Sequence, residues 1–282
     1  MLPSITNCFL KKTERMIAIS TGRKRSHVKA LATTPSREFA YYIDPALMRD
    51  TGMLGEVKIE KTAESPSGDE WFPSILDNGR LTAFIPGNPG AGKSYLAKEL
   101  INLLPSDYDV LLFTALEEED GNFADLKQKL HKIRMEPENL KRLTLSTIRK
   151  VSRHPVLLFD DIDKIRDKEV EKLTFAILED ALANGRGHKA HDGEGDIHVI
   201  VTTHSLNDYR KTKYTLENSD YVAVFPASTT YVQLRRLFEK MGLDKDLCDR
   251  VVEAGKGCMI RRAIIHKVSP MYIIIGGTIE LL

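Results

Sequence analysis

The sequence predicts an α/β protein in which a mainly parallel central sheet is flanked by helices, plus a small N-terminal segment. From residue 80 onward, short apolar runs alternate with helical patterns, which is the order of successive βαβ units. The chain has 282 residues, of which 42% are hydrophobic and 29% are charged. This length and composition suit one large globular domain with an appendage. The longest apolar runs, such as residues 272–275, are far shorter than the roughly 18 residues of a membrane span.

The first 79 residues are predicted to form a separate N-terminal segment, basic at its start, to which the sequence assigns no fold. Residues 62–79 are rich in Ser, Pro, Gly and acidic residues, which predicts a linker or long loop with Trp71 and Phe72 as an anchor. The main domain is therefore expected to span residues 80–282. Two strand-like patterns precede the linker, at residues 39–43 and 56–61.

The main domain begins with a strand and a helix. Leucines at helical spacing follow the first apolar run, and Pro105 comes just after them, which predicts a helix over residues 94–104. A longer helical pattern from Val170 to Ala181 should stop at Gly185. Five apolar runs have the length of buried strands, at residues 81–85, 110–113, 156–159, 197–201 and 221–225. The C-terminal part predicts two helices and a closing hairpin, near residues 230–241 and 244–254 and at residues 259–265 and 271–275.

The strongest motif is GNPGAGKS, at residues 87–94, which matches the phosphate-binding P-loop pattern between a predicted strand and helix. Its backbone N–H groups and the start of the following helix suit phosphate oxygens, so ATP and Mg²⁺ are the expected ligands. Lys93 would reach the β- and γ-phosphates, and the Ser94 hydroxyl would ligate Mg²⁺. The alternative is a glycine-rich turn without a ligand. The candidate nucleotide-binding residues are Gly87, Asn88, Pro89, Gly90, Ala91, Gly92, Lys93 and Ser94.

A second motif, VLLFDDID, places two aspartates at the tip of an apolar strand that we expect beside the P-loop. Asp160 is predicted to hold Mg²⁺ through a water ligand. Asp161 is predicted to act as the base that orients the attacking water, and Asp163 is a weaker candidate for the same role. The alternative for Asp161 and Asp163 is an ordinary role as acidic helix N-caps.

A third motif, HVIVTTHSLNDY, ends another strand with polar residues. This strand is expected to lie beside the one that ends at Asp160. Thr203 or His204 would then face the γ-phosphate, where a polar side chain can distinguish ATP from ADP. The alternative for His204 is a structural hydrogen bond at the end of a strand.

Two other polar clusters and the three cysteines give weaker evidence of function. Residues 117–120 form an acidic run typical of a solvated loop, and His188, His191 and Asp192 lie in a glycine-rich loop with no fourth metal ligand. Cys8, Cys248 and Cys258 are far apart and form no CxxC pair, so we expect buried thiols in a reducing compartment.

The net charge of +1 conceals an uneven distribution. Residues 1–34 carry a net charge of +6, residues 35–204 carry −8, and residues 205–282 carry +3. The near-zero total argues against a uniformly basic nucleic-acid coat, but DNA could still be contacted through the basic ends or through a few pore-facing lysines and arginines. The basic N-terminus could equally be a nuclear signal or a transit peptide. No NKxD or LSGGQ motif is present, and no arginine-rich lid follows the P-loop, which argues against GTPases, transporter cassettes and small-molecule kinases.

Residues 80–282 resemble the viral genome-packaging ATPases of the FtsK–HerA superfamily, the poxvirus-type motors of large DNA viruses. The resemblance rests on the order of the P-loop, VLLFDD, NGR at residues 184–186, THSLNDYR, YVAVFP and MGL. This sequence departs from the family pattern where members often carry Glu at Asp161 and Gln at His204, and residues 187–196 resemble an insertion. The resemblance does not extend to the N-terminal segment.

The resemblance implies an ATPase assembled as a ring of identical subunits that drives double-stranded DNA into a capsid. It further implies capsid or portal-type partners and a location in the infected host cytoplasm or the virion. Because phosphoryl transfer is catalysed mostly by positioning and charge stabilisation, an arginine supplied by a neighbouring subunit is also expected. Arg186 and Arg210 are the candidates for that arginine. The alternatives are another FtsK–HerA-type translocase or helicase, or a P-loop protein that binds nucleotide as a switch without moving DNA.

Overall fold

The computed structural model describes a series of short strands in the first 79 residues and most of the chain after them. Residues 117–120, His188, His191, Asp192, Cys8 and Cys258 lie outside the described residues. The described ranges are 15–21, 28–33, 40–43, 55–57, 62–64, 71–73, 80–115, 123–187, 195–204, 206, 209–256, 261–268, 271–276 and 278–282.

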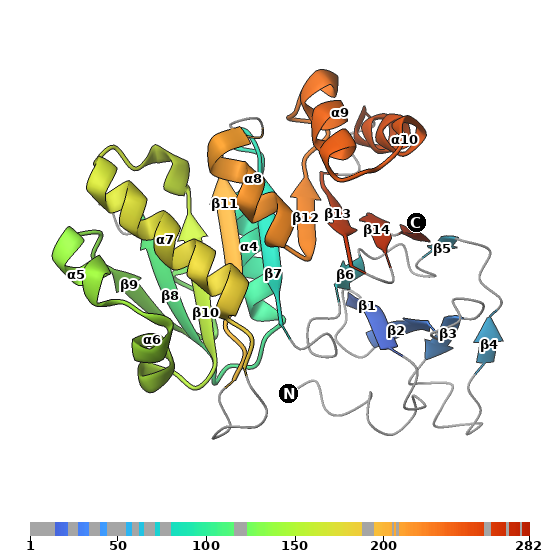
Figure 1. Cartoon of the computed structure of the whole chain (residues 1–282). Coiled ribbons are helices and arrows are strands. Elements are labelled where there is room, and N and C mark those ends of the chain that lie inside the picture. Colours follow the sequence, from blue (N-terminus) through green and yellow to red (C-terminus); the bar gives the residue numbers. More distant parts are fainter. Residues whose placement is uncertain are drawn as a thin grey trace.

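A ten-stranded sheet forms the centre of the molecule, in the order β5-β15-β14-β13-β12-β7-β11-β10-β8-β9 (Figure 1). The strands from β12 to β9 in this order are all parallel, whereas β13, β14, β15 and β5 extend the sheet in antiparallel fashion. The predicted mainly parallel sheet is therefore confirmed. The strands are β5 (Thr62–Glu64), β7 (Thr82–Pro86), β8 (Asp109–Thr114), β9 (Lys129–Ile133), β10 (Pro155–Asp160), β11 (His198–Thr203), β12 (Tyr221–Val224), β13 (Ala263–His266), β14 (Tyr272–Ile275) and β15 (Thr278–Leu281).

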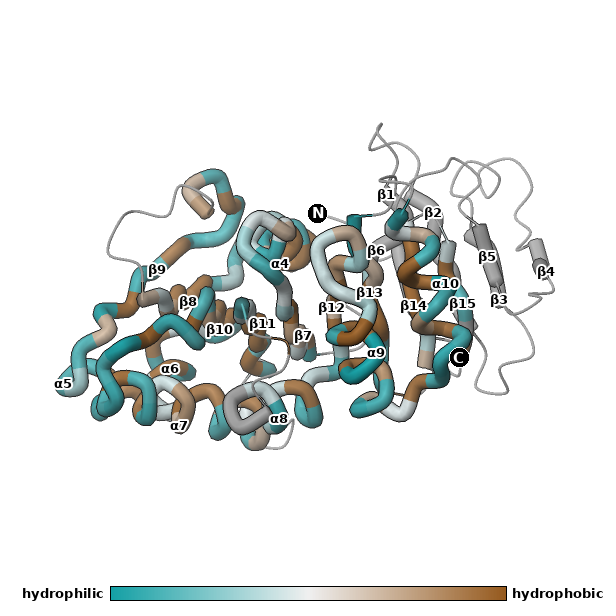
Figure 2. Tube along the Cα trace, turned by 90° about the horizontal axis from the view of Figure 1, so that it is seen from above, coloured by the Kyte–Doolittle hydropathy of each residue, from teal (hydrophilic) through white to brown (hydrophobic). Residues whose placement is uncertain are grey.

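Helices cover both faces of this sheet (Figure 2). Helix α4 packs on one face with a core that includes Val156 and Leu158, and α5 to α8 pack on the other face with a core that includes Leu157 and Phe159. Because successive residues of β10 enter opposite cores, the strand is a continuous apolar run. The helices are α4 (Lys93–Asn102), α5 (Pro137–Arg142), α6 (Leu145–Val151), α7 (Lys168–Asn184), α8 (Tyr209–Asn218), α9 (Tyr231–Lys240) and α10 (Lys245–Lys256), with a short 3₁₀ helix η2 (Ile162–Lys164).

The buried elements match the sequence prediction to within a few residues at each end. The five predicted strands correspond to β7, β8, β10, β11 and β12, and the predicted C-terminal hairpin is β13 and β14. Helix α7 begins after Asp167, whose carboxylate accepts from two backbone N–H groups, and ends at Gly185 as expected. The prediction missed β9, β15, α5, α6 and α8, which are short or polar.

A second sheet of five antiparallel strands, in the order β4-β3-β2-β1-β6, lies in the N-terminal segment. Of its strands, only β3 and β4 overlap the patterns predicted there. The predicted linker is wrong at β5 and β6, since β5 pairs with β15 in the large sheet and β6 pairs with β1. The boundary at residues 79 and 80 stays a prediction. The strands are β1 (Arg15–Thr21), β2 (Val28–Thr33), β3 (Ala40–Ile43), β4 (Gly55–Val57) and β6 (Trp71–Pro73).

Within the described residues, every helix is too short or too polar to cross a bilayer.

Candidate functional site

The P-loop connects β7 to α4, as the sequence predicts. Gly90 and Gly92 have φ angles of 77° and 98°, in the left-handed region that favours glycine, and Gly92 is the N-cap of α4. A Cβ atom at Gly87 would lie 3.0 Å from the Phe225 ring, so the start of the loop sits closely over the residue that follows β12. The loop is also tied to β11, because the Gly87 N–H donates to the Thr203 carbonyl at 3.0 Å.

Lys93 is the P-loop cation, and only 6% of the residue is exposed. Its Nζ lies 3.5 Å from the Asn88 carbonyl oxygen and 3.7 Å from Asp161 Oδ1. Burial lowers the pKa of Lys93, and the negative charges of Asp161 and Asp160 oppose that shift. The ammonium group therefore lies at the loop and is held by a carbonyl and a carboxylate that a triphosphate could replace.

Asp160 is the last residue of β10 and is almost fully buried. Strand β11 lies between β10 and β7, and the end of β10 lies beside the P-loop as expected, since the next residue, Asp161, contacts Lys93. The predicted neighbour of β10, the strand that ends at Thr203, is confirmed. The Thr202 hydroxyl donates to Asp160 Oδ1 at 2.7 Å.

Asp161 has a φ of 49°, the one positive φ of a non-glycine residue in the described part of the chain. Its carboxylate lies 2.6 Å from His204 Nε2 and 3.6 Å from Lys164 Nζ, in addition to Lys93. Burial raises the pKa of Asp161, but the His204 hydrogen bond and the Lys93 charge outweigh it, so the pKa is lowered overall. The side chain makes no capping hydrogen bond to η2, which removes the N-cap alternative for this residue.

His204 makes the structural hydrogen bond that the sequence offered as one alternative, and its role as a γ-phosphate sensor stays a prediction. Its backbone N–H donates to both Asp163 carboxylate oxygens, at 3.1 and 3.0 Å, which is a structural contact. Its ring bonds Asp161, while Nδ1 is buried without a hydrogen-bond partner in the described structure. Thr203 is buried, and its carbonyl is the group that receives the Gly87 N–H. The polar end of β11 therefore contacts both the P-loop and the aspartates.

Thr202, like Lys164, is a site residue that the sequence did not identify. Its side chain is fully buried, and its hydroxyl contacts both aspartates. The signal is the register of β10 and β11, in which Phe159 pairs with Val201 and the next residues, Asp160 and Thr202, are therefore opposite each other. That register is a property of the folded sheet and could not be derived from either motif alone.

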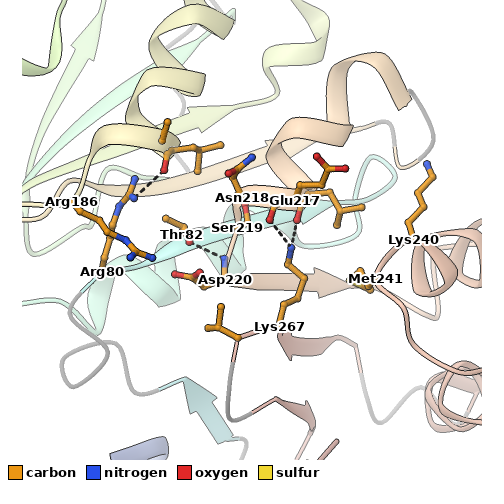
Figure 3. A pocket seen from close by; sticks show the side chains of 14 residues that line it. Arg80, Thr82, Arg186, Glu217, Asn218, Ser219, Asp220, Lys240, Met241 and Lys267 are labelled. Carbon is orange, nitrogen blue, oxygen red and sulfur yellow. Dashed lines mark hydrogen bonds between the residues drawn. The ribbon is translucent and has the colours of Figure 1, made fainter.

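The structure does not bring Arg186 together with the P-loop of its own chain. Arg186 is exposed after α7, at the amino ends of β7 and β11, whereas the P-loop lies at their carboxyl ends. There it lines an open pocket of about 580 Å³ together with Arg80, Asp220 and Lys267 (Figure 3). Arg210, the other candidate, lies in α8.

The Arg80 side chain links the end of α7 to the residue that precedes β11. Its guanidinium donates to the carbonyl oxygens of Ile197 at 2.8 Å and Leu182 at 3.1 Å, and also to that of Ala181. Burial lowers the pKa of Arg80 to about 10, which the negative charge of Asp220 opposes. Two of these contacts are with carbonyl groups in the last turn of α7, so Arg80 is a structural residue.

The oxygen ligands beside the P-loop suit a magnesium ion that is bound by the protein and by nucleotide phosphates together. Ser94 offers a hydroxyl and Asp160 a carboxylate, the hard oxygen ligands that Mg²⁺ takes with phosphate oxygens. Among the described residues, no group of three or more His, Cys, Asp or Glu side chains could hold a metal ion by itself. A divalent ion here would therefore depend on a bound nucleotide.

Comparisons with known proteins show which proteins this chain resembles. Residues 83–220 match the ATPase family associated with various cellular activities (AAA). Over 200 residues the chain is 30% identical to "Uncharacterized protein V3" of Sputnik virophage, covering 69% of this chain and 74% of that protein. The X-ray structure of the Legionella pneumophila ATPase DotB is 13% identical, with 89% of this chain and 68% of that chain covered and a TM-score of 0.27. The chain is a P-loop ATPase and belongs to the same family as the V3 protein of Sputnik virophage.

Proposed function

We propose that this ATPase is a motor of the FtsK–HerA type that translocates double-stranded DNA and packages a viral genome into a capsid. The observation that carries the proposal is the 3.7 Å ion pair between Lys93 and Asp161. A bound triphosphate would attract Lys93 away from this carboxylate, so nucleotide binding would change the contacts at the ends of β10 and β11. A motor needs such a link between its nucleotide and its protein segments.

The hydrolysis step follows from the position of each group. Lys93 would hold the β- and γ-phosphates, and Ser94 and Asp160 would hold Mg²⁺, which neutralises phosphate charge when bound. Asp161 would orient the attacking water in line with the γ-phosphate. Thr203 and His204, at the end of β11, would sense the γ-phosphate. Catalysis in this reaction class consists mostly of positioning and charge stabilisation.

The proposal further includes assembly into a ring, binding of DNA and interaction with viral proteins. Arg186 lies far from the P-loop of its own chain, which suits an arginine that acts on the nucleotide of a neighbouring subunit. The similarity to a virophage protein supports a viral setting, in the infected cell or the virion, with capsid or portal-type proteins as partners. The basic ends of the sequence are the expected DNA contacts.

The test is ATPase activity with and without double-stranded DNA over a series of salt concentrations. A motor should be stimulated by DNA, and the stimulation should fall steeply with salt because phosphate contacts release counterions. Displacement of a third strand from a triplex by the wild type, but not by Lys93→Ala, would support translocation. Separation of a forked duplex would favour a helicase instead. Hydrolysis that DNA does not change at any salt concentration would contradict the motor and favour a nucleotide switch.

A further inference from the structure

Thr202 is the penultimate residue of β11, and its side chain lies between the two aspartates that end β10. The residue is fully buried. Its Oγ1 lies 2.7 Å from Asp160 Oδ1 and 3.4 Å from Asp161 Oδ1, and it accepts the Asp161 backbone N–H at 2.9 Å. One hydroxyl therefore contacts both of the residues to which the proposed function assigns metal binding and water activation.

The direction of these hydrogen bonds follows from the single proton of the Thr202 hydroxyl. A hydroxyl has one proton to donate, while its oxygen can accept from other groups. Because the Asp161 N–H points at this oxygen, the hydroxyl proton is free to go to a carboxylate, and Asp160 Oδ1 is the nearer one. Thr202 thus orients the Asp160 carboxylate and anchors the Asp161 backbone at the same time.

The anchor matters because the Asp161 backbone is strained. A left-handed φ is costly for a residue with a Cβ atom and persists only where the surroundings hold it. The hydrogen bond from the Asp161 N–H to the Thr202 hydroxyl oxygen holds the Asp161 backbone in this conformation. It keeps the side chain directed at Lys93 and His204.

We propose that Thr202 is a positioning residue for ATP hydrolysis, which it supports by holding Asp160 and Asp161 in the geometry that the reaction needs. The role rests on the proposed function in so far as Asp161 orients the attacking water. It requires no contact between Thr202 and the nucleotide. Loss of the hydroxyl should therefore slow the chemical step and leave nucleotide binding nearly intact.

The other reading is that Thr202 is only a buried threonine with its hydroxyl satisfied. Thr174 is such a residue and provides a matched control. It is also fully buried, and its hydroxyl donates to the Val170 carbonyl at 2.8 Å within α7. Replacement of either threonine by valine removes one buried hydroxyl, but only Thr202 contacts the aspartates.

The experiment compares Thr202→Val, Thr202→Ser and Thr174→Val with the wild type. The readouts are kcat and KM for ATP, the Kd of a fluorescent ATP analogue measured without Mg²⁺, and the thermal unfolding midpoint. For Thr202→Val we expect kcat to fall at least about tenfold with the Kd changed less than about threefold, since the lost contacts act on the reaction rather than on binding. Thr202→Ser keeps the hydroxyl and should restore kcat to within about threefold of the wild type. Thr174→Val should keep the wild-type kcat even if its unfolding midpoint falls.

Three results would overturn the proposal. These are a Thr202→Val enzyme with wild-type kcat, an equal fall of kcat in Thr174→Val, or a Thr202→Ser enzyme as slow as Thr202→Val. If Thr202→Val does not fold, Thr202→Ala replaces it in the same comparison. The smaller side chain leaves room for a water molecule, which could bond the Asp160 carboxylate and the Asp161 backbone N–H in place of the lost hydroxyl. A wild-type protein without ATPase activity would refute the proposed function itself, and the role of Thr202 with it. That outcome is visible before any variant is measured.

Discussion

Acid should destabilise this protein through His198, a buried histidine at the start of β11. The residue is 3% exposed, and its Nδ1 accepts the Leu81 backbone N–H at 3.0 Å. Burial lowers the pKa of His198 to about 4, and the neighbouring positive charges of Arg80 and His154 act in the same direction, while Asp196 opposes them. A protonated ring would also lose the acceptor that Leu81 uses.

The sign follows from comparing the folded and unfolded states. The unfolded chain takes up this proton as the pH falls below the ordinary value of about 6.5, whereas the folded protein resists it until about pH 4. The contribution of neutral His198 to stability is therefore complete above pH 6.5 and is lost as the pH falls toward 4. These two pKa values give a loss of about 2 kcal/mol between pH 7.5 and pH 5.

Urea unfolding at pH 7.5 and pH 5 measures this loss. Other groups also titrate in this range, so the informative quantity is the difference between the wild type and His198→Asn, which keeps an acceptor but does not ionise. We expect the wild type to lose about 2 kcal/mol more than this variant. His131→Asn is the control, since the His131 side chain is 37% exposed on the edge strand β9. Equal losses in the wild type and His198→Asn would refute the reasoning.

Three further variants test the fold and the site. Gly185→Ala should destabilise the protein by about 2 kcal/mol in urea unfolding, because its Cβ would lie 2.6 Å from Arg80 Nη2 and closer still to the Ala181 carbonyl oxygen; an unchanged midpoint would show that this packing is not tight. Lys93→Ala should abolish binding of a fluorescent ATP analogue, and normal ATPase activity in it would remove the P-loop assignment. Asp161→Asn should bind ATP but hydrolyse it about a hundredfold more slowly or worse, and unchanged single-turnover rates would exclude Asp161 as the base.

The residues that the sequence placed correctly share a strong local signal. The P-loop needs glycines at particular positions followed by a helix, and both are visible in eight consecutive residues. The strand before Asp160 is apolar throughout because both of its faces are buried, so its type could be predicted without its neighbours. By contrast, β9 has the sequence KLHKI at an edge of the sheet, and α8 has the sequence YRKTKYTLEN, so neither sequence contains the continuous apolar run or the apolar helical spacing that predicts a buried element.

The sequence by itself determined the fold class, the phosphate loop and the presence of acidic and polar residues at strand ends. Only the tertiary structure decided that β11 lies between β7 and β10, that β5 joins the large sheet, and that Thr202 rather than Thr203 bridges the aspartates. Periodicity and motifs depend on neighbours along the chain, so a sequence displays them directly. Strand order and register depend on pairing between residues far apart in the chain, such as that of β11 with β7 and of β15 with β5, and this pairing exists only once the sheet has formed.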